Sequence, residues 1–421
     1  MELGTGRLVK GTLQVSASRA VEGVVALAFS IIVARTLGDD YGYVGAAMGV
    51  WGIVNIVSTI GVPIANTKYV ADLSARRGNE AARASVARTM LLEGVLTGIA
   101  AVLLFLLAAV FIFLSIFLPS RFLTLFNFQS MATQIPEFGL LAMGVMIAML
   151  MGGIDLSVVS IASVSGIIAA KLMTGMIKGG VPPGQTGYVV LLAIAAAIGV
   201  SAVCGVVNGI VVGYLRVNPV IATIGTNSLF MGVGIIITSS RGIIGFPDAF
   251  LFIGNGFLWI FPFPVVIFIA LALFVTVVLN RTKFGIQTRM IGTNQKAAYF
   301  ANIDISLTYV KVYLLSGILS GISSLIMISR VNSAKSGYGE SYLLETVLVS
   351  ILGGVDPRGG YGKISGLVIA LVTLQFLKNG SNILNFTPFV KNIISGFLLI
   401  LVMVINSIGA ARSVKTEPSK S

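Results

Sequence analysis

The 421-residue chain contains no histidine and a single cysteine, and only 10% of its residues are charged. The absence of histidine excludes metal sites and acid–base chemistry that depend on an imidazole. Cys204 has no second cysteine with which to form a disulfide within the chain. A soluble domain carries about 25% charged residues, whereas 56% of this chain is hydrophobic. The composition therefore predicts an all-α, polytopic transmembrane protein of roughly 10–12 spans in a lipid bilayer.

The net charge of +13 comes from lysines and arginines that are scattered in short loops between apolar runs. This distribution is typical of signals that orient a membrane protein, and it does not indicate a nucleic-acid partner. The most basic loops, residues 68–88 and 281–304, are expected in the cytoplasm. We therefore predict a multi-pass protein of the plasma (inner) membrane, with the N-terminus and the basic tail at 411–421 both cytoplasmic.

Residues 150–166 (LMGGIDLSVVSIASVSG) combine the end of an apolar run, a glycine pair, the lone carboxylate Asp155 and a serine-rich stretch. A lone aspartate inside a bilayer costs roughly 2.5–3.5 kcal/mol on insertion scales. It is tolerated where a helix breaks and its backbone lines a cavity. Two interpretations stay open: Asp155 caps a helix N-terminus at the membrane surface, or it lies on a transport path. Both interpretations predict a broken helix.

The sequence LMGGID at 150–155 recurs as LGGVD at 352–356. Paired glycine-interrupted segments in two halves of a membrane protein indicate the central pathway of a transporter. Chance recurrence in a glycine-rich chain is the alternative. The segment 343–356 is also too short to span a bilayer with ease, which favours broken or re-entrant helices.

Membrane helices are expected over 20–34, 44–65, 89–118, 137–151, 156–173, 188–215, 218–234, 257–279, 307–329, 364–378 and 389–408. We expect loops outside the cytoplasm at 117–131 and at 330–342. Residues 290–301 are compatible with a short amphipathic helix on the membrane surface, and Trp259 with an anchor at the membrane interface.

Motifs that would support catalysis are weak or missing. The stretch GGYGKIS at 359–365 departs from a phosphate-binding loop, because Pro357 replaces the first glycine and Ile364 replaces the serine or threonine after the lysine. Paired carboxylates, a nucleophile elbow and a metal cluster are not evident. The charges nearest the apolar runs lack an evident partner at helical spacing: Glu93, Asp155, Lys171, Glu345 and Asp356. We therefore predict a chain that is not an enzyme and that holds no cofactor, metal or ATP.

The start of the chain carries FSIIVARTLG at 29–38, IGVPIANTKYVAD at 60–72 and a basic loop after them. In these features residues 1–105 resemble the polysaccharide (lipid-linked oligosaccharide) flippases. The resemblance covers only the first helices that such a flippase needs, and an ordinary pair of membrane helices is the alternative. It implies an alternative function, the flipping or export of lipid-linked oligosaccharide.

A second set of motifs follows, and it is spread over most of the remaining chain: FLTLFNF at 122–128, GGIDLSV at 152–158, VNGIVVGYLRVNPVIATIGT at 207–226, IGTNQKAAYFANID at 291–304 and ILGGVDPRGGYGKISG at 351–366. With these motifs, residues 111–408 resemble the membrane permease of simple-sugar (ribose-type) ABC importers. One departure is Val159, where the family usually has glycine. A branched side chain there stiffens the helix after the break.

The permease resemblance implies a transmembrane pore subunit of an ATP-driven importer for a monosaccharide or related small sugar. It implies three partners: an ABC ATPase subunit that binds the ATP, an extracytoplasmic sugar-binding protein, and a second permease in a homodimer or heterodimer. By resemblance, the ATPase-docking segment contains Gly292, Asn294, Ala297 and Ala298. The candidates for the translocation pathway are Asp155, Ser157 and Asn208.

The two resemblances meet in residues 94–120, which contain no charged residue. As one helix this stretch is roughly 40 Å long, against a hydrocarbon core of roughly 30 Å. A hybrid helix over 89–118 satisfies the topology of both parts. We therefore divide the chain into flippase-like helices at 1–105, a permease domain at 106–410 and a tail at 411–421. A natural fusion and an assembled reading frame both stay open, and residues 1–85 are expected to pack loosely.

Overall fold

The computed structural model describes residues 106–387, 389–397 and 400. The chain forms two compact units, Met1–Thr124 and Leu125–Ser421, which are described separately. In the first unit, the described elements are an apolar helix, Leu106–Phe117, and α5, Pro119–Phe122. The flippase-like helices and the expected loose packing of residues 1–85 lie outside the described residues.

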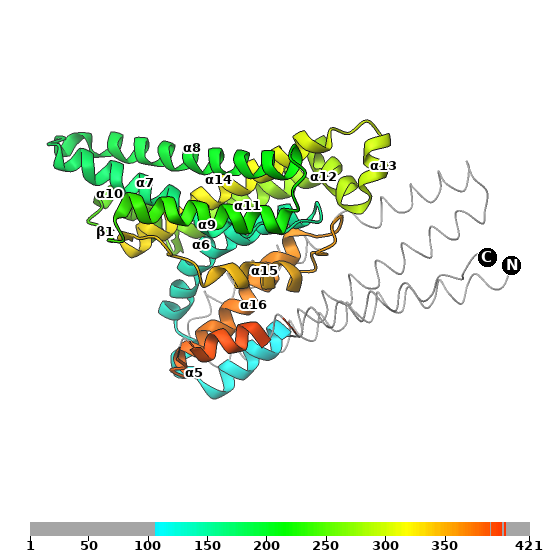
Figure 1. Ribbon diagram of the computed structural model, residues 1–421. Coiled ribbons are helices and arrows are strands. Elements are labelled where there is room, and N and C mark those ends of the chain that lie inside the picture. The colour runs from blue at the N-terminus through cyan, green and yellow to red at the C-terminus, as the bar shows by residue number, and fades with distance from the viewer. Residues whose placement is uncertain (1–105, 388, 398–399, 401–421) are drawn as a thin grey trace. The chain divides into compact units, whose positions relative to one another are not determined.

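The described part of the second unit has seven helices that are long and apolar enough to cross a membrane (Figure 1). They are α6 (Leu125–Met149), α7 (Val158–Lys178), α8 (Thr186–Gly213), α9 (Pro219–Thr238), α11 (Phe263–Arg281), α14 (Ile305–Val331) and α16 (Ile364–Ile383). The shorter helical elements are η1 (Pro183–Gln185), α10 (Asp248–Asn255), α12 (Lys283–Thr293), α13 (Gln295–Phe300) and α15 (Tyr342–Leu352). The predicted all-α, polytopic membrane fold is thus confirmed.

Strands are limited, in the described part of the chain, to two short antiparallel pairs. The pair β1 (Ile243–Ile244) with β4 (Ser333–Ala334) joins the connections that follow α9 and α14. The pair β2 (Phe257–Leu258) with β3 (Phe261–Pro262) forms a hairpin directly before α11. Each strand has two residues, so these pairs tie connections together and do not build a sheet core.

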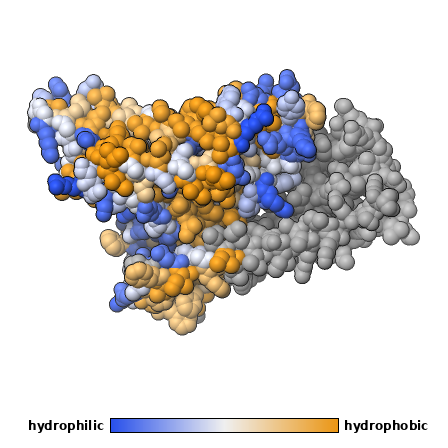
Figure 2. Space-filling view, in the orientation of Figure 1, coloured by the Kyte–Doolittle hydropathy of each residue, from blue (hydrophilic) through white to orange (hydrophobic). Residues whose placement is uncertain are grey.

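The centre of the second unit is formed by α6, α7 and α14. In their most apolar windows, 78%, 72% and 78% of the residues are buried, against 22% in α9 and 28% in α11. Helix α14 packs along α8, α6 and α7. Hydrophobic side chains cover much of the visible surface of the spans, and hydrophilic ones gather toward the helix ends (Figure 2). Helices α9 and α11 therefore present their apolar faces outward, as a membrane environment requires.

The predicted loop at 117–131 is wrong, because this stretch is helical and α6 begins at Leu125. The amides of Asn127 and Asn379 on α16 exchange two hydrogen bonds, of 2.6 and 3.1 Å. Further along the same two helices, Gln375 Nε2 donates to Gln134 Oε1 at 3.3 Å. These polar side chains look like loop residues in the sequence, but paired amides are satisfied between membrane helices.

Two other expected segments are subdivided in the structure. The span expected at 257–279 begins with the β2–β3 hairpin, and the helix itself starts at Phe263, after Pro262. Trp259 lies in the turn of that hairpin and is 91% exposed. The amphipathic helix expected at 290–301 is divided between α12 and α13. Asn294 separates them, and its Oδ1 accepts a hydrogen bond from Ala297 N at 3.0 Å, which caps α13.

Candidate functional site

The predicted helix break lies between the end of α6 at Met149 and the start of α7 at Val158. Asp155 is fully buried in it. One carboxylate oxygen, Oδ1, accepts hydrogen bonds from Ser157 N at 3.0 Å and Ser157 Oγ at 2.6 Å. The other, Oδ2, accepts from Ser316 Oγ on α14 at 2.8 Å. The carboxylate therefore satisfies the start of α7 and fastens it to α14.

The three pathway candidates named from the sequence lie together. Asn208 Nδ2 on α8 donates to Ser157 Oγ at 2.6 Å, and Ser157 in turn contacts Asp155. All three side chains are fully buried among helices of their own chain. The Asp155 carboxylate therefore lies at the start of α7 inside the core of the chain, and not at an exposed helix end.

The break is also attached to α9. Thr223 Oγ1 donates to Ile154 O at 3.1 Å. A Cβ atom on Gly153 would lie 2.7 Å from Pro219 Cβ, so the backbone of the break touches the first turn of α9 directly. The break thus contacts α8, α9 and α14 as well as the two helices that it joins.

The repeated motif forms a similar turn at the end of α15, an 11-residue helix that is too short to span. Gly152 and Gly354 have φ angles of +80° and +81°. The two carboxylates differ, because Asp356 pairs with Arg358 in its own loop, Nη2 to Oδ2, at 3.0 Å. The loop that follows the second motif reaches the first, since Gly360 N donates to Leu150 O at 2.8 Å.

The predicted docking residues lie on α12 and α13, but they do not share one face. Ala298 is buried and Gly292 packs against the helix break, whereas Asn294 and Ala297 are exposed. Two adjacent aromatic residues of α13 are also exposed, Tyr299 at 70% and Phe300 at 85%. The sequence analysis did not name these two residues as docking candidates. Adjacent aromatic residues in an otherwise polar helix are the sequence feature that could have indicated them.

A hollow of about 1200 Å³ separates α13 from the connection between α8 and α9. Its lining includes Lys296 and Phe300 on one side, and Arg216 and Asn218 on the other. The lining thus contains two basic side chains, Arg216 and Lys296, one acidic side chain, Asp304, and aromatic rings of α13.

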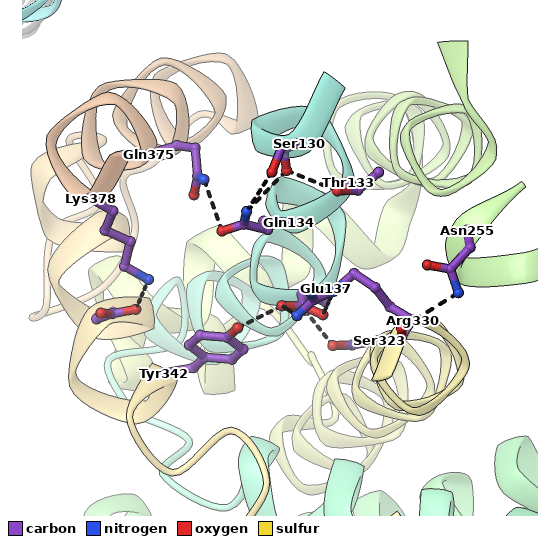
Figure 3. Close-up of polar contacts among 11 residues, drawn as sticks. Ser130, Thr133, Gln134, Glu137, Asn255, Ser323, Arg330, Tyr342, Gln375 and Lys378 are labelled. Carbon is purple, nitrogen blue, oxygen red and sulfur yellow. Dashed lines mark hydrogen bonds and ion pairs between the residues drawn. The ribbon is translucent and has the colours of Figure 1, made fainter. Parts of the chain in front are cut away.

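A second polar cluster, which the sequence did not reveal, surrounds Glu137 on α6 (Figure 3). The Glu137 carboxylate is fully buried and accepts two hydrogen bonds from Arg330 on α14, at 2.9 and 3.0 Å. Tyr342 Oη, at the start of α15, donates to the same carboxylate at 2.6 Å. Ser323 Oγ donates to the main-chain oxygen of Glu137. One side chain thereby joins three helices.

An adjacent ion pair extends this cluster to α16. Lys378 Nζ contacts Glu345 on α15, and it lies 4.7 Å from the ring centroid of Phe138 and 5.0 Å from that of Tyr342. Glu345 therefore has a partner in the fold, although it has none at helical spacing in the sequence. Its partner lies 33 residues away on another helix, where a search at helical spacing does not reach.

The loop expected at 330–342 is present with shorter bounds, between the end of α14 at Val331 and the start of α15 at Tyr342, and this cluster holds both of its ends. Arg330 belongs to the last turn of α14, and Tyr342 begins α15. The buried carboxylate of Glu137 holds both residues, which fixes the two ends of the connection against α6. Charged residues at such depth are costly unless they are paired.

Residues 127–403 match the family described as the permease component of the branched-chain amino acid transport system. The chain belongs to this permease family. Among curated relatives, the ribose import permease of Bacillus subtilis (strain 168) is 33% identical over 297 residues, which cover 70% of this chain and 88% of the relative. No solved structure matches.

Two further relatives are permeases of other import and transport systems. The autoinducer 2 import system permease of Photorhabdus temperata is 32% identical, over 65% of this chain and 81% of its own length. The L-arabinose transport system permease of Escherichia coli (strain K12) is 29% identical, over 70% and 87%. The predicted permease resemblance is thus confirmed. The flippase resemblance at 1–105 lies outside the family match and stays a prediction.

We predict that Glu137→Gln lowers the free energy of unfolding by on the order of 3 kcal/mol, because Arg330 loses its charged partner within the fold. Thermal unfolding of the purified protein in detergent measures this change. Glu340→Gln is the matched control, because Glu340 is exposed. Equal unfolding temperatures for wild type and Glu137→Gln would contradict the prediction.

We predict that Asp155→Asn lowers the free energy of unfolding by about 1–3 kcal/mol, because an amide nitrogen cannot accept the hydrogen bond from Ser316 Oγ. In a double-mutant cycle with Ser316→Ala, the two effects should be non-additive by at least about 0.5 kcal/mol. Thr174→Ala is the control partner, because Thr174 donates only within α7. Strict additivity with Ser316→Ala would show that the hydrogen bond between Ser316 and Asp155 does not stabilise the break.

Proposed function

We propose that this chain is the membrane-spanning pore subunit of an ATP-driven ABC importer for a monosaccharide or related small sugar. The observation that carries the proposal is the match to the permease family over residues 127–403. The named relatives include permeases for ribose and L-arabinose, two pentoses. The buried, serine-lined helix break supplies a permease with the interrupted helix that transport pathways use.

The energy for transport comes, in this proposal, from a separate ATPase subunit that docks on α12 and α13. Exposed aromatic residues beside a concave surface are the usual energetic centre of a protein interface, and Tyr299 and Phe300 flank the hollow. The positive-inside rule supports a cytoplasmic position for this end, which carries four basic residues: Arg281, Lys283, Arg289 and Lys296.

The other partners occupy the remaining surfaces. We assign the sugar-binding protein to the opposite, extracytoplasmic end, where α10 and the β2–β3 hairpin lie. A second permease, identical or different, covers part of the apolar faces that α9 and α11 leave exposed. The protein resides in the plasma (inner) membrane with both termini in the cytoplasm.

Asp155, Ser157 and Asn208 act on the pathway indirectly in this proposal. Asp155 and Ser157 bond to each other, to Ser316 Oγ and to Asn208 Nδ2, inside a single chain, while Asn208 Oδ1 has no partner among the described residues. They hold the break in place, and the transported sugar passes along another face of the helices.

The proposed function predicts ATP-dependent accumulation of radiolabelled ribose or L-arabinose in vesicles that contain the full chain with its co-purifying ATPase and a sugar-binding protein. Accumulation should cease when the ATPase is omitted or when ATP is replaced by ADP, because this chain supplies no ATP site in the proposal. Uptake that continues without the ATPase would contradict an ATP-driven importer.

Docking on α13 predicts that the double variant Tyr299→Ala/Phe300→Ala recovers at least about tenfold less ATPase subunit in a pull-down, because the exposed aromatic anchors are removed. Phe126→Ala is the control, since Phe126 is 81% exposed at the start of α6. Undiminished recovery with the double variant would exclude these side chains as the docking centre.

A further inference from the structure

Four glycines from three distant segments pack backbone to backbone at one point, which we call the glycine junction: Gly152, Gly292, Gly359 and Gly360. Gly152 belongs to the helix break and Gly292 to α12. Gly359 and Gly360 belong to the loop after α15. A Cβ atom on Gly359 would lie 2.7 Å from Gly152 N and 2.9 Å from Gly292 Cα, and one on Gly292 would overlap Leu150 O. No side chain separates the three segments.

Hydrogen bonds fasten the same three segments. Gly360 N donates to Leu150 O at 2.8 Å, which joins the loop to the break. Arg289 Nη1 on α12 donates to Gly362 O at 2.9 Å, which joins the docking helix to the loop. Gly152, Gly359 and Gly360 have φ angles of +80°, +100° and +85°, so the turns themselves also need glycine.

The helix break is in turn bonded to three membrane-spanning helices. Asp155 fastens it to α14, Ser157 to α8, and Ile154 to α9 through Thr223. A continuous set of packed backbones and hydrogen bonds therefore runs from α12 to the first turn of α9. Such close-packed contacts resist compression and move as one body.

We propose that the glycine junction is the rigid joint that transmits displacement of the ATPase-docking segment to the helix break and α9. Its four glycines are positioning residues for transport: they touch neither ATP nor sugar, and they keep three segments in register. This inference rests on the proposed docking of an ATPase at α13. It adds the path of contacts through which docking alters the membrane-spanning helices. Such a path is tested by measuring whether a change at the junction uncouples ATP hydrolysis from transport.

The first test is Gly360→Ala in the full chain, assembled with its ATPase in vesicles. The new methyl group would overlap Thr293 Oγ1 and push α12 away from the loop. We expect ATPase recovery in a pull-down within twofold of wild type. We also expect the amount of labelled ribose accumulated per ATP hydrolysed to fall at least tenfold.

Rescue and matched controls make this test specific. Thr293→Ala removes the oxygen that the methyl group meets, so Gly360→Ala/Thr293→Ala should regain at least half of the wild-type ratio. Gly245→Ala introduces the same backbone strain, since Gly245 has a φ angle of +86°, but its Cβ meets open space. A wild-type ratio in Gly360→Ala, an equal loss in Gly245→Ala, or failure of the rescue would overturn the proposal.

A second measurement needs no disruptive variant. Spin labels at Ile286→Cys on α12 and Ile221→Cys on α9, in a Cys204→Ser background, report the distance across the junction in the ATPase complex. Both positions are exposed. We expect the same narrow distance distribution without nucleotide and with ATP, and a broader one in Gly360→Ala. A wild-type distance that changes when ATP binds would overturn the proposal.

The two proposals fail in different ways. Wild-type vesicles that hydrolyse ATP without accumulating ribose or L-arabinose would contradict the sugar importer. The spin-label distances would then still test the glycine junction independently. Wild-type vesicles that accumulate sugar, with a Gly360→Ala variant that keeps the wild-type ratio, would contradict the junction alone.

Discussion

A helix interrupted inside a bilayer frees backbone groups that lipid cannot satisfy, and the arrangement of this protein depends on how the break at 150–157 satisfies them. Asp155 accepts from the main chain of Ser157, Ile154 O accepts from Thr223, and Leu150 O accepts from Gly360 N. Each partner comes from a different segment. Satisfying one break therefore fixes α7, α9 and the loop after α15 around it, with α14 added through Ser316. The break is for this reason an organising point of the core and not a local irregularity.

The Glu137 cluster also fastens α6 to neighbouring helices, at a point nearer the middle of α6. Between lipid-embedded helices, apolar contact gives little preference for one neighbour over another, so association relies on close packing and polar bonds. Glu137 binds Arg330 and Tyr342, and the Lys378–Glu345 pair adds α16. Helix α6 is thus held by polar contacts at two levels. Helices α9 and α11 lack such dense burial and expose apolar faces instead.

Local sequence signals predicted the features that local chemistry determines. The glycine pair with Asp155 marked the break, apolar runs marked the seven spans, and the length of 343–356 marked a helix that does not span. Partners that are distant in sequence left no such signal. Glu137 and Arg330 are separated by 193 positions, and Asn127 and Asn379 by 252. Without its partner, Asn127 resembles a loop residue, which is why the sequence of 117–131 predicts a loop.

Each copy of the repeated glycine motif follows the end of a helix, α6 in one case and α15 in the other. Gly152 and Gly354 adopt nearly the same left-handed conformation, yet Asp155 is enclosed by helices while Asp356 binds Arg358 in its own loop. What the two segments share is therefore a backbone turn that stops a helix short, and not a carboxylate with a common role. Because glycines have no side chain, the backbone of a third segment can approach these turns closely. Gly292 of α12 lies against Leu150 O of the first motif and Gly360 N of the loop that follows the second, so the helix next to the predicted docking surface packs on both segments.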